Sequence, residues 1–499
     1  MELNTAIQKI NDMEKASYAL NHAMNILYVD GDTVAPKKSW KGRGEALGYL
    51  SELSYRLLVN PETGEVLDTV LNAKDQADPK VFRQAELIRE AYDEIHLFPM
   101  EEYVAYQQLL NEASTVWHDA KEKSDFPLFA PYLEKLIAFQ KRFASLKDST
   151  KHPYDVLLDT FEKGASREML DPFFDTVRTE LAPLIAEIGT RPQPDHPFLH
   201  AQYPVGLQRE FAHRVMKMEG IDPACCTLGE TEHPFTSGSN KWDVRITTHY
   251  YENDMASSLF SVIHEGGHAL YEMGVADDLQ FTSLAGGSTM GIHESQSRFY
   301  ENLICRSLPF CRALLPVMRD IFPDQVGSLT AEELYAAINI ARPSLIRTDA
   351  DELTYPLHVL IRYEIEKAIF SGDLKVTDLP GIWNELYKKF LGLEVPDDRR
   401  GILQDSHWSG GSFGYFPSYA LGSAYGVQML RRMEADMNVW GTVEAGDLRP
   451  VTAWLGEKIH QYGRLKKPQE ILLNAMGGPL DATVYTGYLQ KKYRELYKL

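Results

Sequence analysis

Three residues between positions 264 and 268 have the types and the spacing of a metal-dependent hydrolytic site. His264, Glu265 and His268 form the pattern H-E-x-x-H inside the apolar, helix-length segment 258–274. On an α-helix, side chains four positions apart point the same way one turn apart, so both imidazoles can reach a single metal ion. Neutral imidazole suits zinc, and a carboxylate beside the metal can take a proton from a metal-bound water. The pattern predicts a water-activating zinc site.

A hydrolytic zinc site usually takes three protein ligands and keeps one position for water. The class in which a third histidine follows six residues after the second is excluded, because Gly274 stands there. A glutamate on a second helix is the alternative, and Glu294 is the natural candidate. Glu272 and Glu301 are rivals. Glu272 lies on the same helix as His268, so its carboxylate would have to fold back towards the metal.

Other polar residues supply the remaining groups that peptide hydrolysis needs. Attack on a peptide carbonyl develops an oxyanion, which a phenol or an imidazole can stabilise together with the metal. His407, Tyr415 and Tyr419 supply such donors within the glycine- and aromatic-rich segment 401–422. That composition is typical of a loop that forms the wall of a site.

Two arginines are candidates for binding a substrate carboxylate, because a guanidinium matches a carboxylate in a two-pronged fork. They are Arg347 and Arg245. In the alternative, structural interpretation, Arg245 pairs with Asp243, and Arg347 pairs with Asp349 or Asp351. A chain with a formal net charge of −20 needs such local cations to hold an anionic peptide end.

Helices must position most of these residues. Apolar residues recur every three or four positions, and strand signals are nearly absent, from the N-terminus to about position 190. Three prolines in segment 191–197 cannot continue a helix. We therefore expect a mainly helical single peptidase domain over 1–499, with a helical sub-lobe at 1–190 and a catalytic sub-lobe at 198–499.

One strong strand interrupts the helices. Val244, Ile246 and Thr248 alternate with polar residues over 243–248, which is the two-residue period of a strand. The strand ends shortly before the H-E-x-x-H segment, so we expect it to border the metal cleft and to offer its edge to an extended peptide. Further helices are expected at 203–218, after the capping box Thr330-x-x-Glu333, and at 353–370.

Composition limits the partners. The net charge argues against nucleic acid and against anionic membranes, because the field of the protein would repel both. We find neither an apolar run long enough to span a membrane nor a signal peptide, and we expect a cytoplasmic protein. The four cysteines lack the number and spacing of a disulfide framework or a cysteine zinc site, so free thiols are expected.

Six motifs in fixed order extend the pattern beyond the metal site. They are HPF at 233–235, D-x-R-x-T at 243–247, H-E-x-x-H at 264–268, HESQS at 293–297, I-R-x-x-A-D at 346–351 and G-x-x-Q-D-x-H-W at 401–408. With these motifs the chain resembles the Taq-type metallocarboxypeptidase family, zinc enzymes that remove C-terminal residues from peptides. The resemblance implies a helical, two-lobed body around a deep groove, with a small β element at the zinc site, and commonly a homodimer.

The resemblance also implies roles for single residues. His264, His268 and Glu294 correspond to the ligands of one zinc ion per chain, which other divalent metals such as cobalt can replace, and Glu265 corresponds to the base. The order of His407, two glycines and Tyr419 looks like a loop of the related helical zinc oligopeptidases. We therefore favour Tyr419 and His407 as catalytic donors and assign Tyr415 to substrate binding.

The leading hypothesis is a cytoplasmic zinc carboxypeptidase that acts on peptides with a free C-terminus. A zinc-dependent endo-acting oligopeptidase is the first alternative, because the same metal centre serves both reactions. A non-catalytic peptide-binding protein is the alternative from another class. The intact H-E-x-x-H residues argue against it, because a site that has lost its activity usually loses the base.

Overall fold

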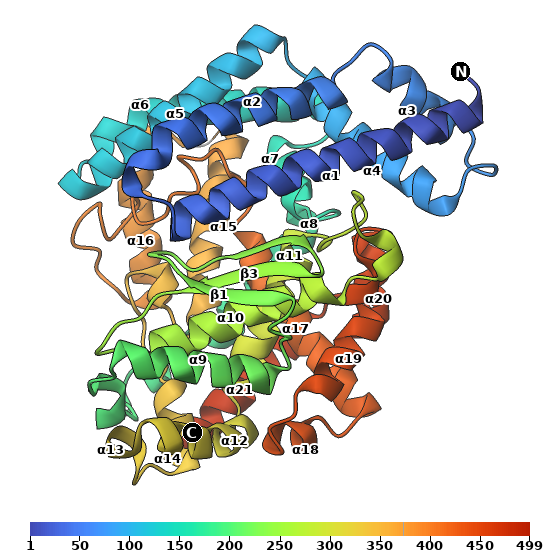
Figure 1. Ribbon diagram of the computed structural model, residues 1–499. Coiled ribbons are helices and arrows are strands. Elements are labelled where there is room, and N and C mark those ends of the chain that lie inside the picture. The colour runs from blue at the N-terminus through green and yellow to red at the C-terminus, as the bar shows by residue number, and fades with distance from the viewer. Residues whose placement is uncertain (373) are drawn as a thin grey trace.

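The computed structural model describes residues 1–372 and 374–499 of the chain, and helices make up most of it (Figure 1). The N-terminal helices are α1 Leu3–Thr33, α2 Trp40–Leu58, α3 Thr63–Leu71, α4 Pro79–His96, α5 Met100–Lys123, α6 Phe126–Lys147, α7 Pro153–Phe161 and α8 Arg167–Ile188. The later helices are α9 Val205–Glu219, α10 Met255–Gly274, α11 Met290–Arg298, α12 Leu308–Ile321, α13 Pro323–Val326, α14 Ala331–Ile338, α15 Tyr355–Ser371, α16 Leu379–Leu391, α17 Pro417–Asp436, α18 Val439–Glu444, α19 Arg449–Lys458, α20 Pro468–Met476 and α21 Ala482–Tyr497.

A small sheet lies between the early and the late helices. Its strands are β1 Cys226–Glu230, β2 Thr236–Asn240 and β3 Asp243–Thr248, in the order β1-β3-β2. Strand β1 runs parallel to β3 and β2 runs antiparallel to it, with Ser237 opposite Arg245. This arrangement confirms the predicted class: a mainly helical body with a small β element.

The sheet sits on α10, which carries the H-E-x-x-H residues. Val244 and Ile246 of β3 are buried, and α10 packs against both β3 and β2. On the other face, Asn25 of α1 exchanges hydrogen bonds with the Ser237 and Ser239 hydroxyls of β2 (2.5 and 2.9 Å). Figure 1 shows α1 crossing above the sheet and α10 below it. The alternation of strand side chains thus separates a metal-facing side from an α1-facing side.

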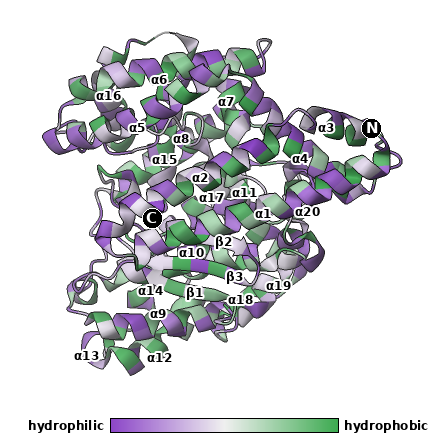
Figure 2. Cartoon of the chain, turned by 45° about the horizontal axis from the view of Figure 1, so that its top comes forward, coloured by the Kyte–Doolittle hydropathy of each residue, from purple (hydrophilic) through white to green (hydrophobic). Residues whose placement is uncertain are grey.

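Two apolar clusters hold the helices together. The main one joins α5 to α8 with the helices after residue 205, and it includes Trp383, Tyr154 and Phe129. A smaller cluster joins α1, α3 and α4 around Ile10 and Leu67. Colouring by hydropathy shows polar and apolar residues interleaved along the outer helices, as expected where one side of a helix is buried (Figure 2).

Several local predictions are confirmed. The capping box at Thr330 and Glu333 begins α14, and α15 ends at Gly372, which adopts a left-handed conformation. The four cysteines are free, and Cys225 is only partly buried. Within the described parts of the chain, no helix combines the length and the apolarity needed to cross a bilayer.

Candidate active site

Helix α10 presents both predicted histidines on one side. It begins after Asp254, whose carboxylate accepts a hydrogen bond from the Ser257 amide (3.1 Å) as an N-cap. Val262 and Ile263 are fully buried and fix the rotation of the helix in the core. His264 and His268 are therefore held one turn apart at the edge of the core, and their side chains keep 20% and 16% exposure.

Helix α11 brings the third predicted ligand to them. The Glu294 Oε2 atom lies 3.7 Å from His264 Nε2 and 3.6 Å from His268 Nε2. Donor atoms of these three residues all lie within 4.8 Å of one another. Two ligands that each lie about 2.0–2.2 Å from one ion in tetrahedral geometry are separated by roughly 3.3–3.6 Å. The two nitrogens and one oxygen fit a single divalent metal ion and form a candidate metal site.

Glycines allow the helices to approach this closely. A Cβ on Gly267 would lie 2.6 Å from the Gln296 carbonyl oxygen of α11, and one on Gly422 of α17 would lie 2.9 Å from Glu294 Cβ. A Cβ on Gly266 would lie 2.7 Å from a carboxylate oxygen of Glu219, at the end of α9. The H-E-G-G-H sequence therefore accommodates α11 on one side and α9 on the other.

A buried ionic network supports His264. The His264 Nδ1 atom lies 2.9 Å from Glu301 Oε2, in the π-helical turn Phe299–Ile304 that continues α11. The Arg298 guanidinium donates to both Glu294 (2.7 Å) and Glu301 (3.3 Å), and Arg306 lies 3.4 Å from Glu301. These arginines hold the pKa of Glu301 far below its usual range, against the opposing effect of burial. Glu301, a rival for the third ligand, thus lies behind His264.

A second chain of contacts supports His268. Its Nδ1 atom lies 2.6 Å from Nδ1 of His293, and His293 Nε2 lies 2.7 Å from Glu272 Oε1. Glu272 also accepts a hydrogen bond from the Gly287 amide (3.0 Å). Glu272, the second rival for the third ligand, contacts His293, and His293 lies between it and His268.

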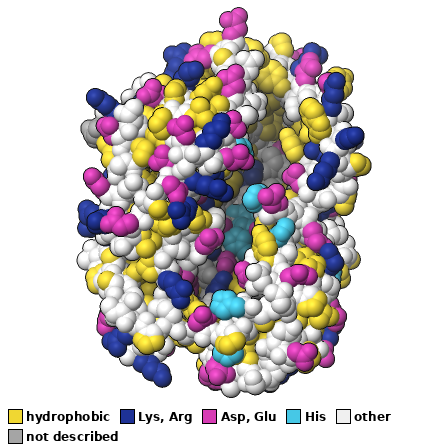
Figure 3. Space-filling model, turned by 90° about the vertical axis from the view of Figure 1, so that its left-hand side faces the viewer, with side chains coloured by type: hydrophobic (Ala, Val, Ile, Leu, Met, Phe, Trp, Pro, Cys, Tyr) yellow, Lys and Arg dark blue, Asp and Glu magenta, His cyan; other side chains and the backbone are white. Residues whose placement is uncertain are grey.

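A cavity of 780 Å³ opens onto the candidate metal site. Its lining includes His264, Glu265, Glu294, Arg347 and Tyr419. In Figure 3 the exposed face is hollowed along its middle, and histidine side chains lie at the floor of the hollow. Several of the predicted residues, distant in sequence, thus share one enclosed space.

Glu265 is placed to act in this cavity. The Thr236 hydroxyl of β2 donates to its Oε2 atom (2.6 Å), and the side chain is largely buried. Burial raises the pKa of the Glu265 carboxyl, although the neighbouring His264 and Thr236 act in the opposite direction. A carboxylate with a raised pKa is a better proton acceptor than an ordinary surface glutamate.

Of the three predicted donors, Tyr419, in the first turn of α17, is the one that lines the cavity. Its hydroxyl lies 3.1 Å from His407 Nε2. Burial lowers the pKa of His407 to about 4, so the ring is neutral at pH 7, and its Nδ1 atom is buried with no partner among the residues described. Either the imidazole or the phenol can supply the hydrogen of this contact, because each group can donate and accept. Tyr419 thus has a buried imidazole partner at the edge of the cavity.

His407 and Tyr415 lie behind Tyr419 and are not among the described lining residues of the cavity. The ring centroids of Tyr415 and Tyr419 are 5.2 Å apart in an edge-to-face arrangement, and Tyr415 packs similarly against Phe161. This position gives Tyr415 a packing contact with the cavity wall. Its predicted contact with substrate stays a prediction.

Arg347 lines the cavity but is not paired as the sequence suggested. Its Nε and Nη2 atoms donate to Asp405 Oδ1 (3.0 and 2.9 Å), and Nη1 donates to the Tyr355 hydroxyl (2.9 Å). Arg362 holds the other oxygen of Asp405 (2.7 Å). Asp351 instead accepts backbone hydrogen bonds at the start of α15. The partner of Arg347 is therefore Asp405, which belongs to the G-x-x-Q-D-x-H-W motif.

Arg245 lies on the face of the sheet that is turned away from α10. It pairs with Asp243 through two hydrogen bonds (2.9 and 3.2 Å), as the structural interpretation expected. Val244 and Ile246 face α10, so strand alternation turns Arg245 towards the α1 side. It is absent from the described lining of the cavity.

The expectation that β3 offers its edge to a peptide is wrong. Strand β3 is the central strand, with β1 and β2 paired on either side of it. Strands β1 and β2 are the edge strands, and Thr236, the first residue of β2, contacts Glu265. The strand T-S-G-S-N has no apolar alternation, and for that reason periodicity did not reveal it.

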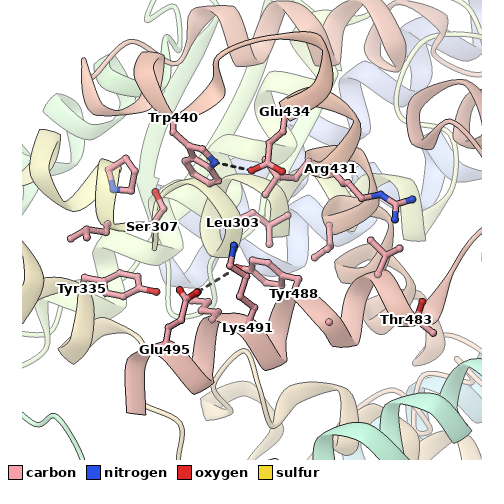
Figure 4. A pocket seen from close by; sticks show the side chains of 17 residues that line it. Leu303, Ser307, Tyr335, Arg431, Glu434, Trp440, Thr483, Tyr488, Lys491 and Glu495 are labelled. Carbon is pink, nitrogen blue, oxygen red and sulfur yellow. Dashed lines mark hydrogen bonds between the residues drawn. The ribbon is translucent and has the colours of Figure 1, made fainter. Parts of the chain in front are cut away.

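A second cavity, of 620 Å³, lies between α12, α17, α18 and α21 (Figure 4). Leu303 and Tyr488 line it, and the Trp440 indole donates to Glu434 (2.7 Å) at one side. None of the predicted site residues is among its described lining residues. Its largely apolar walls bring no cluster of metal ligands together.

Sequence reasoning missed several groups that shape the site, among them Arg298, Arg362 and Asp405. Asp405 lay in a recognised motif, which is a signal that could have been used. Arg298 follows Glu294 by one helical turn, a spacing at which a guanidinium reaches a carboxylate. Arg362 gave no local signal, because its role depends on how α15 meets the loop before α17.

Comparisons with known proteins agree over nearly the whole chain. The family model described as carboxypeptidase Taq (M32) metallopeptidase matches residues 9–493. The chain is 40% identical over 501 residues to carboxypeptidase 1 of Bacillus subtilis, covering 100% of both. It is 35% identical over 504 residues to thermostable carboxypeptidase 1 of Pyrococcus furiosus, covering 98% of this chain and 99% of that one. A crystal structure of an M32 carboxypeptidase from Deinococcus radiodurans superposes with a TM-score of 0.96 at 33% identity, covering 99% and 100% of the two chains.

Proposed function

The chain belongs to the carboxypeptidase Taq (M32) metallopeptidase family and is a metal-dependent carboxypeptidase; we propose that its metal is zinc, held by His264, His268 and Glu294. The observation that carries this proposal is the cluster of two imidazole nitrogens and one carboxylate oxygen beside Glu265. This donor set with an open side is the usual one for hydrolytic zinc. Zinc bound there would act as a Lewis acid and lower the pKa of water.

The side chains of the cavity then divide the remaining work. Glu265 accepts a proton from the attacking water and delivers it to the leaving amine, a role supported by its burial and raised pKa. The Tyr419 hydroxyl donates a hydrogen bond to the developing oxyanion and keeps its proton, and His407 orients that hydroxyl. The contact between the Tyr419 hydroxyl and His407 Nε2, at the edge of the cavity, supports both roles.

Arg347 is the proposed partner of the substrate carboxylate. Of its five N–H groups, two face Asp405 and one faces Tyr355, so two remain for a ligand. Arg362 and Asp405 hold the guanidinium plane in place. The substrate main chain is proposed to run beside β2, because that edge strand begins next to Glu265. Arg245 remains a helper only if the substrate extends beyond the cavity to the α1 side of the sheet.

A direct test combines metal analysis with product analysis. The purified protein should contain one zinc per chain, and His264→Ala, His268→Ala and Glu294→Ala should each lower that content and abolish turnover. Mass spectrometry of a digested peptide should show successive loss of C-terminal residues. Cuts inside the peptide would instead support an endo-acting oligopeptidase, and full zinc in all three variants would refute the ligand set.

Three further proposals rest on composition and on the family resemblance. We propose a cytoplasmic location and a homodimer, and peptides with free C-termini as substrates. Cell fractionation tests the location, and light scattering on the purified protein measures the oligomeric state. A monomer across the working concentration range would remove the dimer from the proposal.

A further inference from the structure

We propose that His293 and Glu272 form a positioning pair that fixes His268 in the one tautomer able to bind a metal. The inference deepens the proposed function and rests on His268 being a ligand through Nε2. Neither residue was assigned this role by the sequence, which marked Glu272 as a rival ligand. His293 is the first residue of the HESQS motif, and the catalytic proposal gives it no task.

The contacts form a continuous chain from the metal site to a carboxylate. His268 Nε2 faces Glu294 Oε2 at 3.6 Å, while its Nδ1 lies 2.6 Å from His293 Nδ1. On the far side of the second ring, His293 Nε2 lies 2.7 Å from Glu272 Oε1. Each of the two rings therefore uses both of its nitrogens.

The Glu272 carboxylate at one end and the metal-binding nitrogen of His268 at the other together place the hydrogens along these contacts. An ionised carboxylate only accepts hydrogen bonds, so His293 Nε2 carries a hydrogen. A His268 that binds a metal through Nε2 keeps its own hydrogen on Nδ1, so His293 Nδ1 is the acceptor in the contact between the two rings. His268 Nδ1 is then the donor of the 2.6 Å contact, and the lone pair on His268 Nε2 faces Glu294. The opposite order of protons would place a hydrogen on Nε2 and block the metal.

The loop between α10 and α11 holds the side chains of His293 and Glu272 in place. The Gly287 amide donates to the same Glu272 oxygen (3.0 Å), so that oxygen already accepts from two donors. A Cβ on Gly287 would lie 2.2 Å from the His293 ring, so only glycine lets the ring sit there. Arg464 donates to the Gly287 carbonyl (3.0 Å) and fixes the loop from the outside.

The two candidate ligands are thus oriented by different means. His264 Nδ1 meets a carboxylate directly, in Glu301, whereas His268 reaches one through a second imidazole. Partners that hold the second nitrogen of a metal-bound histidine typically change metal affinity by 10–100-fold when they are removed. A similar effect is expected for His293.

Three variants separate the tautomer argument from simple packing. His293→Leu removes the acceptor for His268, and Glu272→Leu removes the group that orders the protons. Both should weaken zinc binding by on the order of 10–100-fold in chelator competition. Glu272→Gln is the matched control, because its amide oxygen can still accept from both His293 Nε2 and the Gly287 amide. It should bind zinc within about threefold of the unmodified protein.

Metal-free and metal-loaded forms of each variant give readouts that do not depend on turnover. The thermal midpoint of the metal-free protein should stay near that of the unmodified chain, while the rise caused by added zinc should shrink in the two leucine variants. The visible spectrum of the cobalt form should change in the same two variants. If His293→Leu does not fold, the Glu272→Leu and Glu272→Gln comparison carries the test alone.

The result that overturns the inference is unchanged zinc affinity in both leucine variants. Equal losses in Glu272→Gln and Glu272→Leu would also overturn it, because charge rather than proton order would then be responsible. His264→Ala serves as the reference for the metal site. If His264→Ala kept full zinc affinity, the proposed ligand set itself would be wrong, whatever the His293 and Glu272 variants show.

Discussion

Exopeptidase action is best tested by removing the Arg347 guanidinium and the substrate carboxylate, singly and together. Arg347 has 6% exposure and lines the same cavity as His264 and Glu294. A substrate carboxylate there would meet a fixed, largely dehydrated guanidinium. At an effective dielectric constant of about 20, two unit charges about 4 Å apart attract by roughly 4 kcal/mol. Truncating one member of a buried charge pair costs about 2–5 kcal/mol.

We therefore expect Arg347→Ala to lower kcat/KM for a free-acid peptide by about 3 kcal/mol, or on the order of 100-fold. Amidating the peptide should cost the unmodified enzyme a similar factor. The two losses should not add, because each removes the same interaction. Arg347→Lys keeps the charge but not the two-pronged fork, so it should fall between the two enzymes. Arg362 still pairs with Asp405 in each variant, which limits the damage to the fold.

The assay compares kcat/KM for an N-blocked dipeptide and its C-terminal amide across the three enzymes. Thermal unfolding of each variant checks that it remains folded. The reasoning would be refuted if Arg347→Ala slowed the acid and the amide by equal factors, since Arg347 would then act only on the fold. Equal rates for acid and amide in the unmodified enzyme would refute carboxylate recognition altogether.

Three further predictions concern single groups. Glu265→Gln should keep zinc by metal analysis but lower kcat by about 100-fold or more, because the amide cannot accept a proton, and undiminished turnover would remove Glu265 from the mechanism. Tyr419→Phe should lower kcat by on the order of 100-fold with little change in KM. His407→Leu should lower kcat by a smaller factor. A change in KM alone in Tyr419→Phe would assign Tyr419 to binding. Burial raises the pKa of Glu162 from 4.5 to about 7, so the folded state favours its protonated form and the free energy of unfolding falls as pH rises between those values. That decrease in the free energy of unfolding is on the order of 3 kcal/mol. Urea denaturation at pH 5 and pH 8 should show most of this decrease in the unmodified protein and little of it in Glu162→Gln. The same pH dependence in both proteins would contradict the assignment to Glu162.

Short-range features of this chain could be predicted because their causes lie within one or two helical turns. The spacing of His264 and His268 defines one side of α10, and a threonine with a glutamate three positions later begins α14. The sequence shows two glycines between the histidines but could not name the neighbours that require them. The structure supplies α11 beside Gly267 and Glu219 beside Gly266.

Long-range features could not be predicted, because pairing decides them rather than local preference. Strand β2 reads as a polar loop and becomes a strand only because β3 supplies its hydrogen bonds. The π-helical turn after α11 places Glu301 in contact with His264, and no hydrophobic periodicity in the sequence predicts such a turn. Arg347 and Asp405 are 58 positions apart, so nearby aspartates were the natural but wrong partners to consider.

The charges around the site explain how so acidic a protein can hold an anionic peptide end. Near the histidines stand the carboxylates of Glu265, Glu272, Glu294 and Glu301, together with the guanidinium groups of Arg298 and Arg306. Among these six groups, four negative and two positive charges leave an excess of two, which a bound divalent ion would neutralise.

Across the cavity, Arg347 and Arg362 share the single carboxylate of Asp405, which leaves one positive charge. A peptide C-terminus carries one negative charge, so it can be bound there without leaving an unbalanced charge in a region of low dielectric. The same balance predicts that a peptide with two carboxylates at its end, such as one ending in aspartate, is a poor substrate. Its second charge would meet no unpaired cation among Arg298, Arg306 and Arg347, so kcat/KM for a C-terminal aspartate should lie well below that for asparagine. Equal values for the two peptides would show that this charge balance does not govern binding.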